Sequence, residues 1–311
     1  LVRKVNIMPT ISIDQNVLRS LIENRGRVHD IADMAERLPL IGCDIDTCND
    51  EVLDVEIFPD RPDLLSCETL FHSVMPFLHN APPMPHLAIR PGTISMTVDQ
   101  ELEKIRPVIL GAVVRGLEVD EGTIKRLMEH QEKLHFSLGR RRKRSSIGVH
   151  DLSKLSPPFK VVAVPRSHTF IPLAMDEEMS IDQILVEHPK GVDYAHLLEG
   201  MEKVPIILDS NQEVLSFPPI INGDHTTVST ETRDIFIDVT GWDLRACESS
   251  LMLICLQLSA LGGKVESVRV SGYDGKEWRI DGTPIEHKVE RKMMESILGN
   301  QFSDEEIDNA I

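Results

Sequence analysis

The stretch "VLSFPPIINGDHTTVSTETRDIFIDVTGW", residues 214–242, decides the fold class because it holds two strand-like runs separated by turn residues. In its second run, successive side chains point to opposite faces of the predicted strand. One face receives Ile235, Ile237 and Val239, and the other receives Phe236, Asp238 and Thr240. Two polar groups thus project side by side from an otherwise apolar strand. A buried carboxylate needs hydrogen-bond partners, so the polar pair belongs either to a functional site or to a structural network.

The first run contains a rigid turn. Pro218 and Pro219 lack backbone N–H donors and stiffen the chain between Ser216 and Asn222. The dipeptide Asn222-Gly223, flanked by strand-like runs, predicts a tight hairpin at that point. On these residues alone, a structural turn and a binding site both stay open.

Familiar catalytic motifs are missing from the chain. His150 in "VHDL" and His225 in "GDHTT" are candidate acid–base groups, but neither has a partner at a fixed spacing. There is no HExxH, P-loop, GxSxG or GxGxxG pattern. The residues alone therefore indicate a mixed α/β protein with a polar pocket on its strands, without an assigned reaction.

Length and composition are those of a globular protein of two or three domains. The chain has 311 residues, of which 41% are hydrophobic and 27% charged. Its five cysteines are odd in number and form no CxxC pair, which indicates reduced thiols, a cytoplasmic protein and no zinc site. No apolar run is long enough to span a bilayer, so we expect no membrane partner.

Charge is distributed unevenly along the chain. The net charge of −17 disfavours general coating of nucleic acid, because phosphates are repelled at long range. One dense cationic run, "GRRRKR", consists of a glycine followed by Arg140, Arg141, Arg142, Lys143 and Arg144. Both a solvated loop and a phosphate-binding patch are consistent with this run.

We expect an α+β fold in three parts. Residues 1–86 form a small α+β domain that ends in the proline-dense "NAPPMPH". Residues 87–273 mix short strands with a few helices and form a central domain with a mixed sheet. Residues 274–311 begin a small helical module that the chain does not finish.

Several segments together resemble the β subunit of phenylalanyl-tRNA synthetase of the archaeal and eukaryotic type. They are "DRPDLLSCETL", "LEKIRP", "LMEHQEKLHFSLGRRRKRSSIGVHDL", "VLSFPPIINGDH", "TRDIFIDVTGWD" and "GGKVESVRV". The resemblance covers nearly the whole chain, with residues 1–7 as an extension before "MPTISI". It implies an N-terminal domain, an editing domain at 87–273 and a helical module.

The resemblance also implies that the two subunits of the enzyme have different activities. The signatures that bind ATP belong to the α subunit of this enzyme, so this chain alone is not expected to aminoacylate. ATP and Mg would belong to the full synthetase, and no cofactor or metal is expected for this chain. The expected partners are tRNA(Phe) and the α subunit, in an α2β2 enzyme.

The activity implied for residues 87–273 is editing, in which positioned water hydrolyses the ester of mischarged Tyr-tRNA(Phe). A hydrophobic pocket rejects an added hydroxyl by only about 10²-fold, so a second site that hydrogen-bonds the tyrosine hydroxyl supplies the missing discrimination. The ester is already activated, and positioning a water and stabilising the oxyanion can suffice without a protein nucleophile. The alternative is a non-catalytic scaffold that docks the α subunit and presents tRNA(Phe).

Carried over residue by residue, the family's editing pocket falls on Ile207, Ser216, Asn222, Asp238 and Thr240. Ile207 would form a wall, where archaeal relatives carry leucine. Ser216 and Asn222 would hold the amino acid or the water. Asp238 would accept a hydrogen bond from the α-amino group or the tyrosine hydroxyl, and Thr240 would order the same network. The five residues Arg140 to Arg144 would contact tRNA phosphates.

Overall fold

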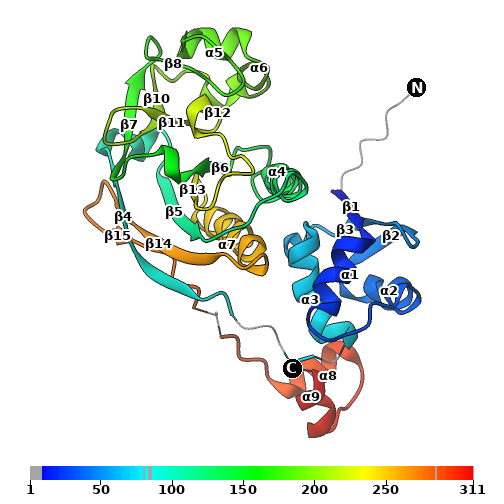
Figure 1. The fold of residues 1–311 in the computed structure, drawn as a ribbon. Coiled ribbons are helices and arrows are strands. Elements are labelled where there is room, and N and C mark those ends of the chain that lie inside the picture. Colours follow the sequence, from blue (N-terminus) through cyan, green and yellow to red (C-terminus); the bar gives the residue numbers. More distant parts are fainter. Residues whose placement is uncertain (1–8, 80, 83–85, 284–285, 311) are drawn as a thin grey trace, which may run out of the picture.

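The computed structural model describes residues 9–79, 81–82, 86–283 and 286–310 (Figure 1). Residues 1–7, which the sequence sets apart as an extension, lie outside this description. So do residues 80 and 83–85 in the expected first boundary. The division at residues 86 and 273 therefore stays a prediction. No helix in the described ranges is long and apolar enough to cross a membrane.

The N-terminal part is a three-stranded antiparallel sheet with helices packed against it. The strand order is β1-β3-β2. Its elements are β1 (Thr10–Asp14), α1 (Gln15–Glu23), α2 (Ile31–Arg37), β2 (Cys43–Cys48), β3 (Val52–Ile57) and α3 (Cys67–His79). Alternate residues of β3 are fully buried, as its period-two pattern requires.

The central part is built on a ten-stranded sheet with the order β12-β11-β10-β7-β4-β14-β5-β13-β6, in which β15 pairs with β14. The strands are β4 (Ile89–Val98), β5 (Val108–Arg115), β6 (Ser145–Asp151), β7 (Phe159–Pro165), β10 (Lys203–Leu208), β11 (Val214–Phe217), β12 (Ile221–Asn222), β13 (Ile235–Gly241), β14 (Lys264–Ser271) and β15 (Glu277–Trp278). Among the strand pairs of the described residues, β4–β14 and β4–β7 are parallel and the others antiparallel. The sheet is therefore mixed, and the expected α+β fold class is confirmed.

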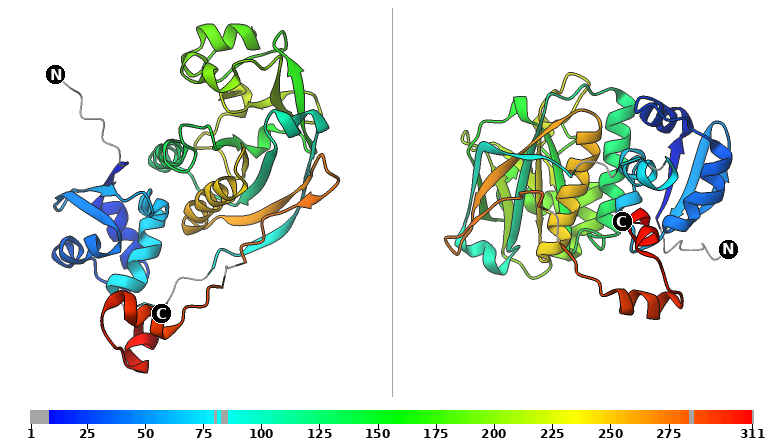
Figure 2. Two further views of the ribbon diagram at one scale, coloured as in Figure 1. Left: turned by 180° about the vertical axis from the view of Figure 1, so that it is seen from behind. Right: turned by 90° about the horizontal axis from the view of Figure 1, so that it is seen from below.

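Helices and a small hairpin complete the described chain. The helices are α4 (Glu121–Phe136), α5 (Ile181–Glu187), α6 (Pro189–Tyr194), α7 (Leu244–Ala260), α8 (Arg291–Leu298) and α9 (Asp304–Ala310), and the hairpin is β8 (Thr169–Phe170) with β9 (Met179–Ser180). Short 3-10 turns lie at Leu38–Ile41, Pro62–Leu64, Gln100–Lys104, Leu152–Lys154, Ala195–Leu198 and Asp224–Thr226. Helices α4 and α7 lie between the large sheet and the N-terminal part (Figure 2).

The large sheet curls until its two ends meet. Strands β6 and β12 stand at opposite ends of the strand order, yet Asn222 Nδ2 donates to the Val149 carbonyl at 3.3 Å. The curl gives the sheet an outer and an inner face. Outward side chains of β13, such as Ile237, pack in one core with α7, whereas Phe236 packs in a second core with Phe159 inside the curl. The alternation expected for β13 is confirmed.

The hairpin predicted at Asn222-Gly223 is wrong. The chain turns earlier, at Pro218 and Pro219, so that Ser216 pairs with Asn222 across β11 and β12. A tight two-residue hairpin turn of type I′ needs positive φ at both central residues, whereas Gly223 is extended with φ −71°. Glycine stands there because a Cβ would collide with the Val214 carbonyl.

A buried polar network joins the N-terminal part to the central part. The fully buried side chain of Glu68, on α3, accepts from Arg126 Nε of α4 at 2.7 Å and from Gln257 Nε2 of α7 at 3.0 Å. The Oε1 atom of Gln257 in turn accepts from His130 Nδ1 at 2.8 Å. These bonds hold α3 against the two helices that cover the outer face of the sheet.

Replacing Glu68 by alanine should lower the free energy of unfolding by about 2–4 kcal/mol. It leaves Gln257 Nε2 without an acceptor and Arg126 without its carboxylate, although Arg126 still reaches water. Urea unfolding followed by circular dichroism measures the change. The matched control is Glu101→Ala, which breaks an exposed pair with Lys203 and should cost less than about 1 kcal/mol. Equal effects of the two substitutions would contradict the structural role of Glu68.

Two buried histidines of α4 should make the free energy of unfolding depend on pH. Burial lowers the pKa of His130 and of His135 to about 4 from the ordinary 6.5. The unfolded chain thus binds more protons than the folded chain between these values, so the free energy of unfolding should fall as pH decreases from 6.5 towards 4. His130→Gln should reduce this slope in urea titrations at a series of pH values. An unchanged slope in this variant would contradict the role of the buried histidine.

Candidate functional site

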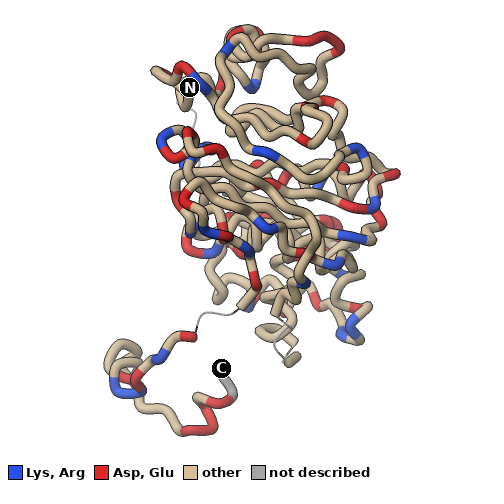
Figure 3. Tube along the Cα trace, turned by 90° about the vertical axis from the view of Figure 1, so that its left-hand side faces the viewer, with Lys and Arg blue, Asp and Glu red and all other residues tan. Residues whose placement is uncertain are grey.

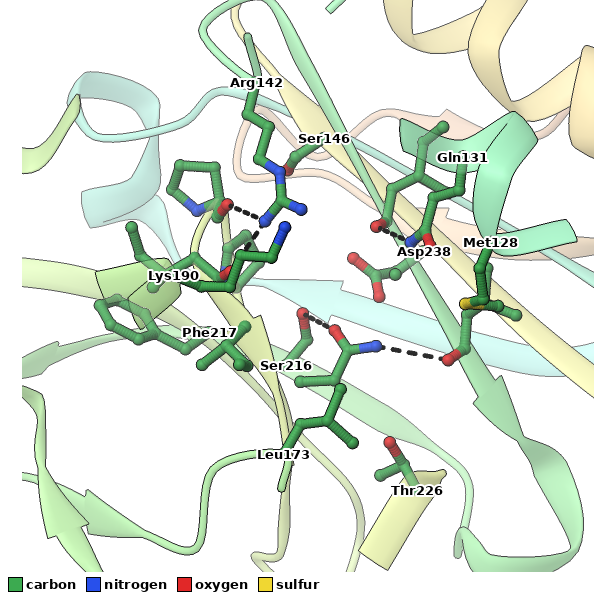
Figure 4. A pocket seen from close by; sticks show the side chains of 18 of the residues that line it. Met128, Gln131, Arg142, Ser146, Leu173, Lys190, Ser216, Phe217, Thr226 and Asp238 are labelled. Carbon is green, nitrogen blue, oxygen red and sulfur yellow. Dashed lines mark hydrogen bonds between the residues drawn. The ribbon is translucent and has the colours of Figure 1, made fainter. Parts of the chain in front are cut away.

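A cavity of about 310 Å³ lies where the two ends of the curled sheet approach each other (Figure 4). Its walls come from β6, β11, β12 and β13, from one side of α4 and from the loop that follows Asn222. This size is at the lower end of the range of small-molecule sites. The cavity therefore has room for a small group presented from outside.

Three of the five expected pocket residues line this cavity: Ser216, Asn222 and Asp238. Ser216 Oγ donates to Asn222 Oδ1 at 3.4 Å, and the Asn222 amide is held in turn by its bond to Val149. Strands β11, β12 and β13 thus present polar groups to one space. The short β11–β12 hairpin fixes the position of both Ser216 and Asn222.

The other two expected residues are buried behind the cavity wall. Ile207 packs in the core inside the curl with Phe159 and Phe236. Thr240 is fully buried, and its Oγ1 accepts from Arg106 Nε at 2.6 Å. Its connection to the cavity is indirect, because Thr240 Oγ1 lies 3.2 Å from Ser146 Oγ and Ser146 is part of the lining.

Asp238 is oriented by a histidine inside the curl. Its Oδ2 lies 2.7 Å from His150 Nε2, and the other ring nitrogen of His150 lies 2.9 Å from Thr226 Oγ1. A carboxylate oxygen only accepts, so Nε2 carries the proton of this bond. The second carboxylate oxygen, Oδ1, accepts no hydrogen bond from the described residues, and Figure 4 shows the carboxylate pointing into the cavity. Asp238 thus offers the cavity an oriented acceptor.

Gly148 makes room for this pair. It stands opposite Asp238 in the β6–β13 register, two residues before His150. A Cβ at this position would collide with Asp238 Oδ2 and come within 2.7 Å of His150 Nε2. A glycine on β6 is therefore a condition for the hydrogen bond between Asp238 and His150.

The expected basic run divides into one buried and four exposed side chains. Arg140, Arg141, Lys143 and Arg144 are exposed, but Arg142 is 7% exposed. Arg142 donates to the carbonyls of Pro219 and Ile220 at 3.2 and 2.8 Å and lies over the ring of Tyr194 at 4.4 Å. The expectation that Arg142 contacts tRNA phosphates is therefore corrected, because its guanidinium is occupied by the protein's own turn at Pro218-Pro219.

The backbone explains this division. Arg140, Arg141 and Arg142 have positive φ angles of 46°, 53° and 63°, which non-glycine residues rarely adopt. This left-handed run turns the chain sharply from α4 into β6 and buries one side chain while its neighbours face outward. Holding three such residues needs support, which the bonds of Arg142 provide.

Aromatic and basic side chains missed by the sequence reasoning adjoin the exposed arginines. Arg245 and Phe136 share a surface depression with Arg140 and Arg144. Next to Arg144 lies Trp242, which is 49% exposed and whose backbone N–H donates to the Arg144 carbonyl at 3.0 Å. Figure 3 shows acidic and basic residues interspersed along the described trace.

The comparisons with known proteins agree with this architecture. A family model, the B3/4 domain, matches residues 119–256, which contain the whole cavity wall from α4 to β13. The chain is 41% identical over 305 residues to the phenylalanine–tRNA ligase β subunit of Methanococcoides burtonii, covering 98% of this chain and 55% of that one. It is 43% identical over 301 residues to that of Methanosarcina acetivorans, covering 96% and 54%.

A solved structure shows the same fold. It is an N-terminal fragment of the phenylalanyl-tRNA synthetase β subunit from Pyrococcus horikoshii, with a TM-score of 0.90, 33% identity, and coverage of 97% of this chain and 88% of that one. The chain thus contains a B3/4 domain, at residues 119–256. It belongs to the phenylalanyl-tRNA synthetase β-subunit family, as its sequence resemblance predicts. It spans about half the length of the full-length relatives that it matches.

Gly148→Ala should disrupt the site with a modest loss of stability. The added methyl group forces Asp238 or His150 away from the other, at a cost of about 1–3 kcal/mol. The chemical shifts of the His150 ring in NMR spectra report the broken hydrogen bond, and urea unfolding gives the cost. Gly122→Ala is the matched control on the exposed start of α4 and should be neutral or slightly stabilising. An unchanged His150 spectrum in the Gly148 variant would contradict this view of the site.

Proposed function

We propose that this chain carries the editing activity of a phenylalanyl-tRNA synthetase: hydrolysis of the ester that joins tyrosine to the terminal ribose of tRNA(Phe). The observation that carries the proposal is Asp238 Oδ1, which points into a cavity of about 310 Å³ and accepts no hydrogen bond from the described residues. Membership of the β-subunit family supplies the substrate class. The proposal places the protein in the cytoplasm, with tRNA(Phe) and the α subunit as partners.

Discrimination would rest on the phenolic hydroxyl. Tyrosine would donate this hydroxyl to Asp238 Oδ1, while His150 keeps Oδ2 in place. Phenylalanine would displace water from the same carboxylate and leave it without a partner, which is costly for a buried charged group. A site that hydrogen-bonds a hydroxyl can reject the analogue that lacks it by about 10⁴-fold or more, far beyond what an apolar pocket achieves.

Hydrolysis would use the remaining polar groups of the cavity. Ser216 and Asn222 lie at one wall and would hold the water or the α-amino group against the ester. Thr240, with Arg106, supports this arrangement from behind the wall through Ser146. An aminoacyl ester is activated enough for a positioned water to attack it, so no side-chain nucleophile is needed.

The exposed part of the basic run would guide the RNA. Arg140, Arg141, Lys143 and Arg144 stand at the end of α4 beside Trp242, and α4 also forms a wall of the cavity. Cations next to an exposed aromatic ring suit a single-stranded RNA end, which is bound by phosphate contacts and base stacking. In a chain with net charge −17, such a local patch confines RNA contact to one region.

The test is to incubate the purified chain with Tyr-tRNA(Phe) and with Phe-tRNA(Phe) and to follow release of the amino acid. We expect faster release of tyrosine, and a loss of about 10²-fold in that rate for Asp238→Ala and Ser216→Ala. Asp182→Asn, at an exposed position outside the cavity, is the control and should keep the rate. Release of both amino acids at the spontaneous rate, together with tight binding of the α subunit, would instead favour a non-catalytic scaffold that presents tRNA(Phe).

A further inference from the structure

Lys190 is a cation on the lining of the cavity that the proposed reaction does not yet use. It stands in the short helix α6, on the opposite side of the cavity from α4. Its side chain is 41% exposed and also lines the cavity. Its partner in the described chain is Glu132 of α4, with Nζ 3.5 Å from Oε1.

The ion pair between Lys190 and Glu132 is long because the carboxylate already accepts a shorter hydrogen bond from another cation. Arg142 Nη2 donates to the same Oε1 atom at 2.6 Å. Burial alone would raise the pKa of the Glu132 carboxyl, but the bond to His135 and the charges of Arg142 and Lys190 outweigh it and hold the pKa well below its usual range. One carboxylate thus stands beside two cations, which leaves an excess of positive charge at Lys190. We call the partly exposed part of the lining at Lys190 the rim of the cavity.

The two cations differ in what they can still bind. Arg142 is 7% exposed and is held by two backbone carbonyls, by Glu132 and by the ring of Tyr194. Lys190 has one long contact and an open path to solvent. An exposed ion pair of this kind contributes little to stability, and an ammonium group is a good point-charge partner for phosphate. Lys190 is therefore the rim cation that is free to change partners.

The proposed substrate brings a phosphate to this place. An aminoacyl ester sits on the ribose of the last nucleotide, and the 5′ carbon of that ribose carries the phosphate that links it to the rest of the RNA. When the acyl group fills the cavity, the phosphate must stay outside, about one ribose away. The rim is the part of the cavity that such a group meets.

We propose that Lys190 Nζ binds the 5′-phosphate of the terminal nucleotide, while Glu132 stays paired with Arg142. This inference rests on the proposed function for the identity of the acyl-nucleotide. It assigns Lys190 as a positioning residue: its charge fixes the ribose and so the register of the ester relative to Asp238 and Ser216. Binding of the phosphate involves no covalent step.

The experiment measures binding, so it does not depend on hydrolysis. Two stable amide analogues are titrated by calorimetry: 3′-(tyrosylamino)-3′-deoxyadenosine with a 5′-phosphate and the same compound without it. We expect the phosphate to tighten binding to the unmodified chain about tenfold, as one charge-assisted hydrogen bond does. Lys190→Ala should abolish this gain and leave the affinity for the analogue without phosphate unchanged, and Lys190→Arg should retain most of the gain.

The control is Lys203→Ala, which removes an exposed, ion-paired lysine outside the cavity lining and should keep the full phosphate effect. The proposal is overturned if the phosphate gives no gain in the unmodified chain, if Lys190→Ala weakens both analogues equally, or if neither analogue binds. Phosphate-dependent binding without release of tyrosine from Tyr-tRNA(Phe) would support the role of Lys190 and overturn the editing reaction. The two proposals can therefore fail separately.

Discussion

Closure of the large sheet on itself is the constraint on which the site depends. Strands β6 and β12 are the two ends of the strand order, and the bond from Asn222 to the Val149 carbonyl joins them. Without the curl, Ser216 and Asp238 would lie on distant strands of an open sheet. With it, they face one cavity, and each edge strand covers the unpaired backbone of the other in part. The cavity exists because the junction is joined by side chains rather than by a continuous ladder of backbone bonds.

The inside of the curl holds opposite charges as well as apolar side chains. Burial lowers the pKa of Arg106 to about 10, so this guanidinium remains charged at neutral pH. Arg106 donates hydrogen bonds to Thr240 Oγ1 and Ser146 Oγ, and Asp238 Oδ2 accepts one from His150 Nε2. These hydrogen bonds hold both buried charges in fixed positions, because a displacement would break the bonds of Arg106 or the bond between Asp238 Oδ2 and His150. A preformed arrangement of this kind suits selection of a substrate by a single hydrogen bond.

The sequence predicted those features that depend on local periodicity. The alternation in β13 placed Asp238 and Thr240 on the face opposite Ile237, and the structure has that arrangement. The same reasoning applied to "SIGVHDL" would have placed Gly148 and His150 on one face of β6. It could not have shown that His150 meets Asp238, because the two residues are 88 positions apart and meet only through the pairing of β6 with β13.

Other features depended on backbone conformations that residue types did not reveal. The dipeptide Asn222-Gly223 is typical of tight hairpins, but here the glycine serves close packing rather than a positive φ angle. In the basic run, two neighbouring arginines have different roles. The chain turns through a run of left-handed φ angles, which leaves the side chain of Arg141 exposed and directs that of Arg142 inward. The family resemblance named Ser216, Asn222 and Asp238, which line one cavity of the structure. That Ser216 lines this cavity while Thr240 lies behind its wall could be seen only in the three-dimensional structure.

The left-handed turn at Arg140 to Arg142 also connects the outer surface to the cavity, because Arg142 bonds to residues that line it. The side chains of Arg140 and Arg141 face the solvent. The guanidinium of Arg142 donates hydrogen bonds to the Pro219 and Ile220 carbonyls, between β11 and β12. The φ angles of Arg140 to Arg142 therefore position the exposed cations and, through Arg142, the turn between β11 and β12. The same backbone torsions thus connect the outer surface at the end of α4 with one wall of the cavity.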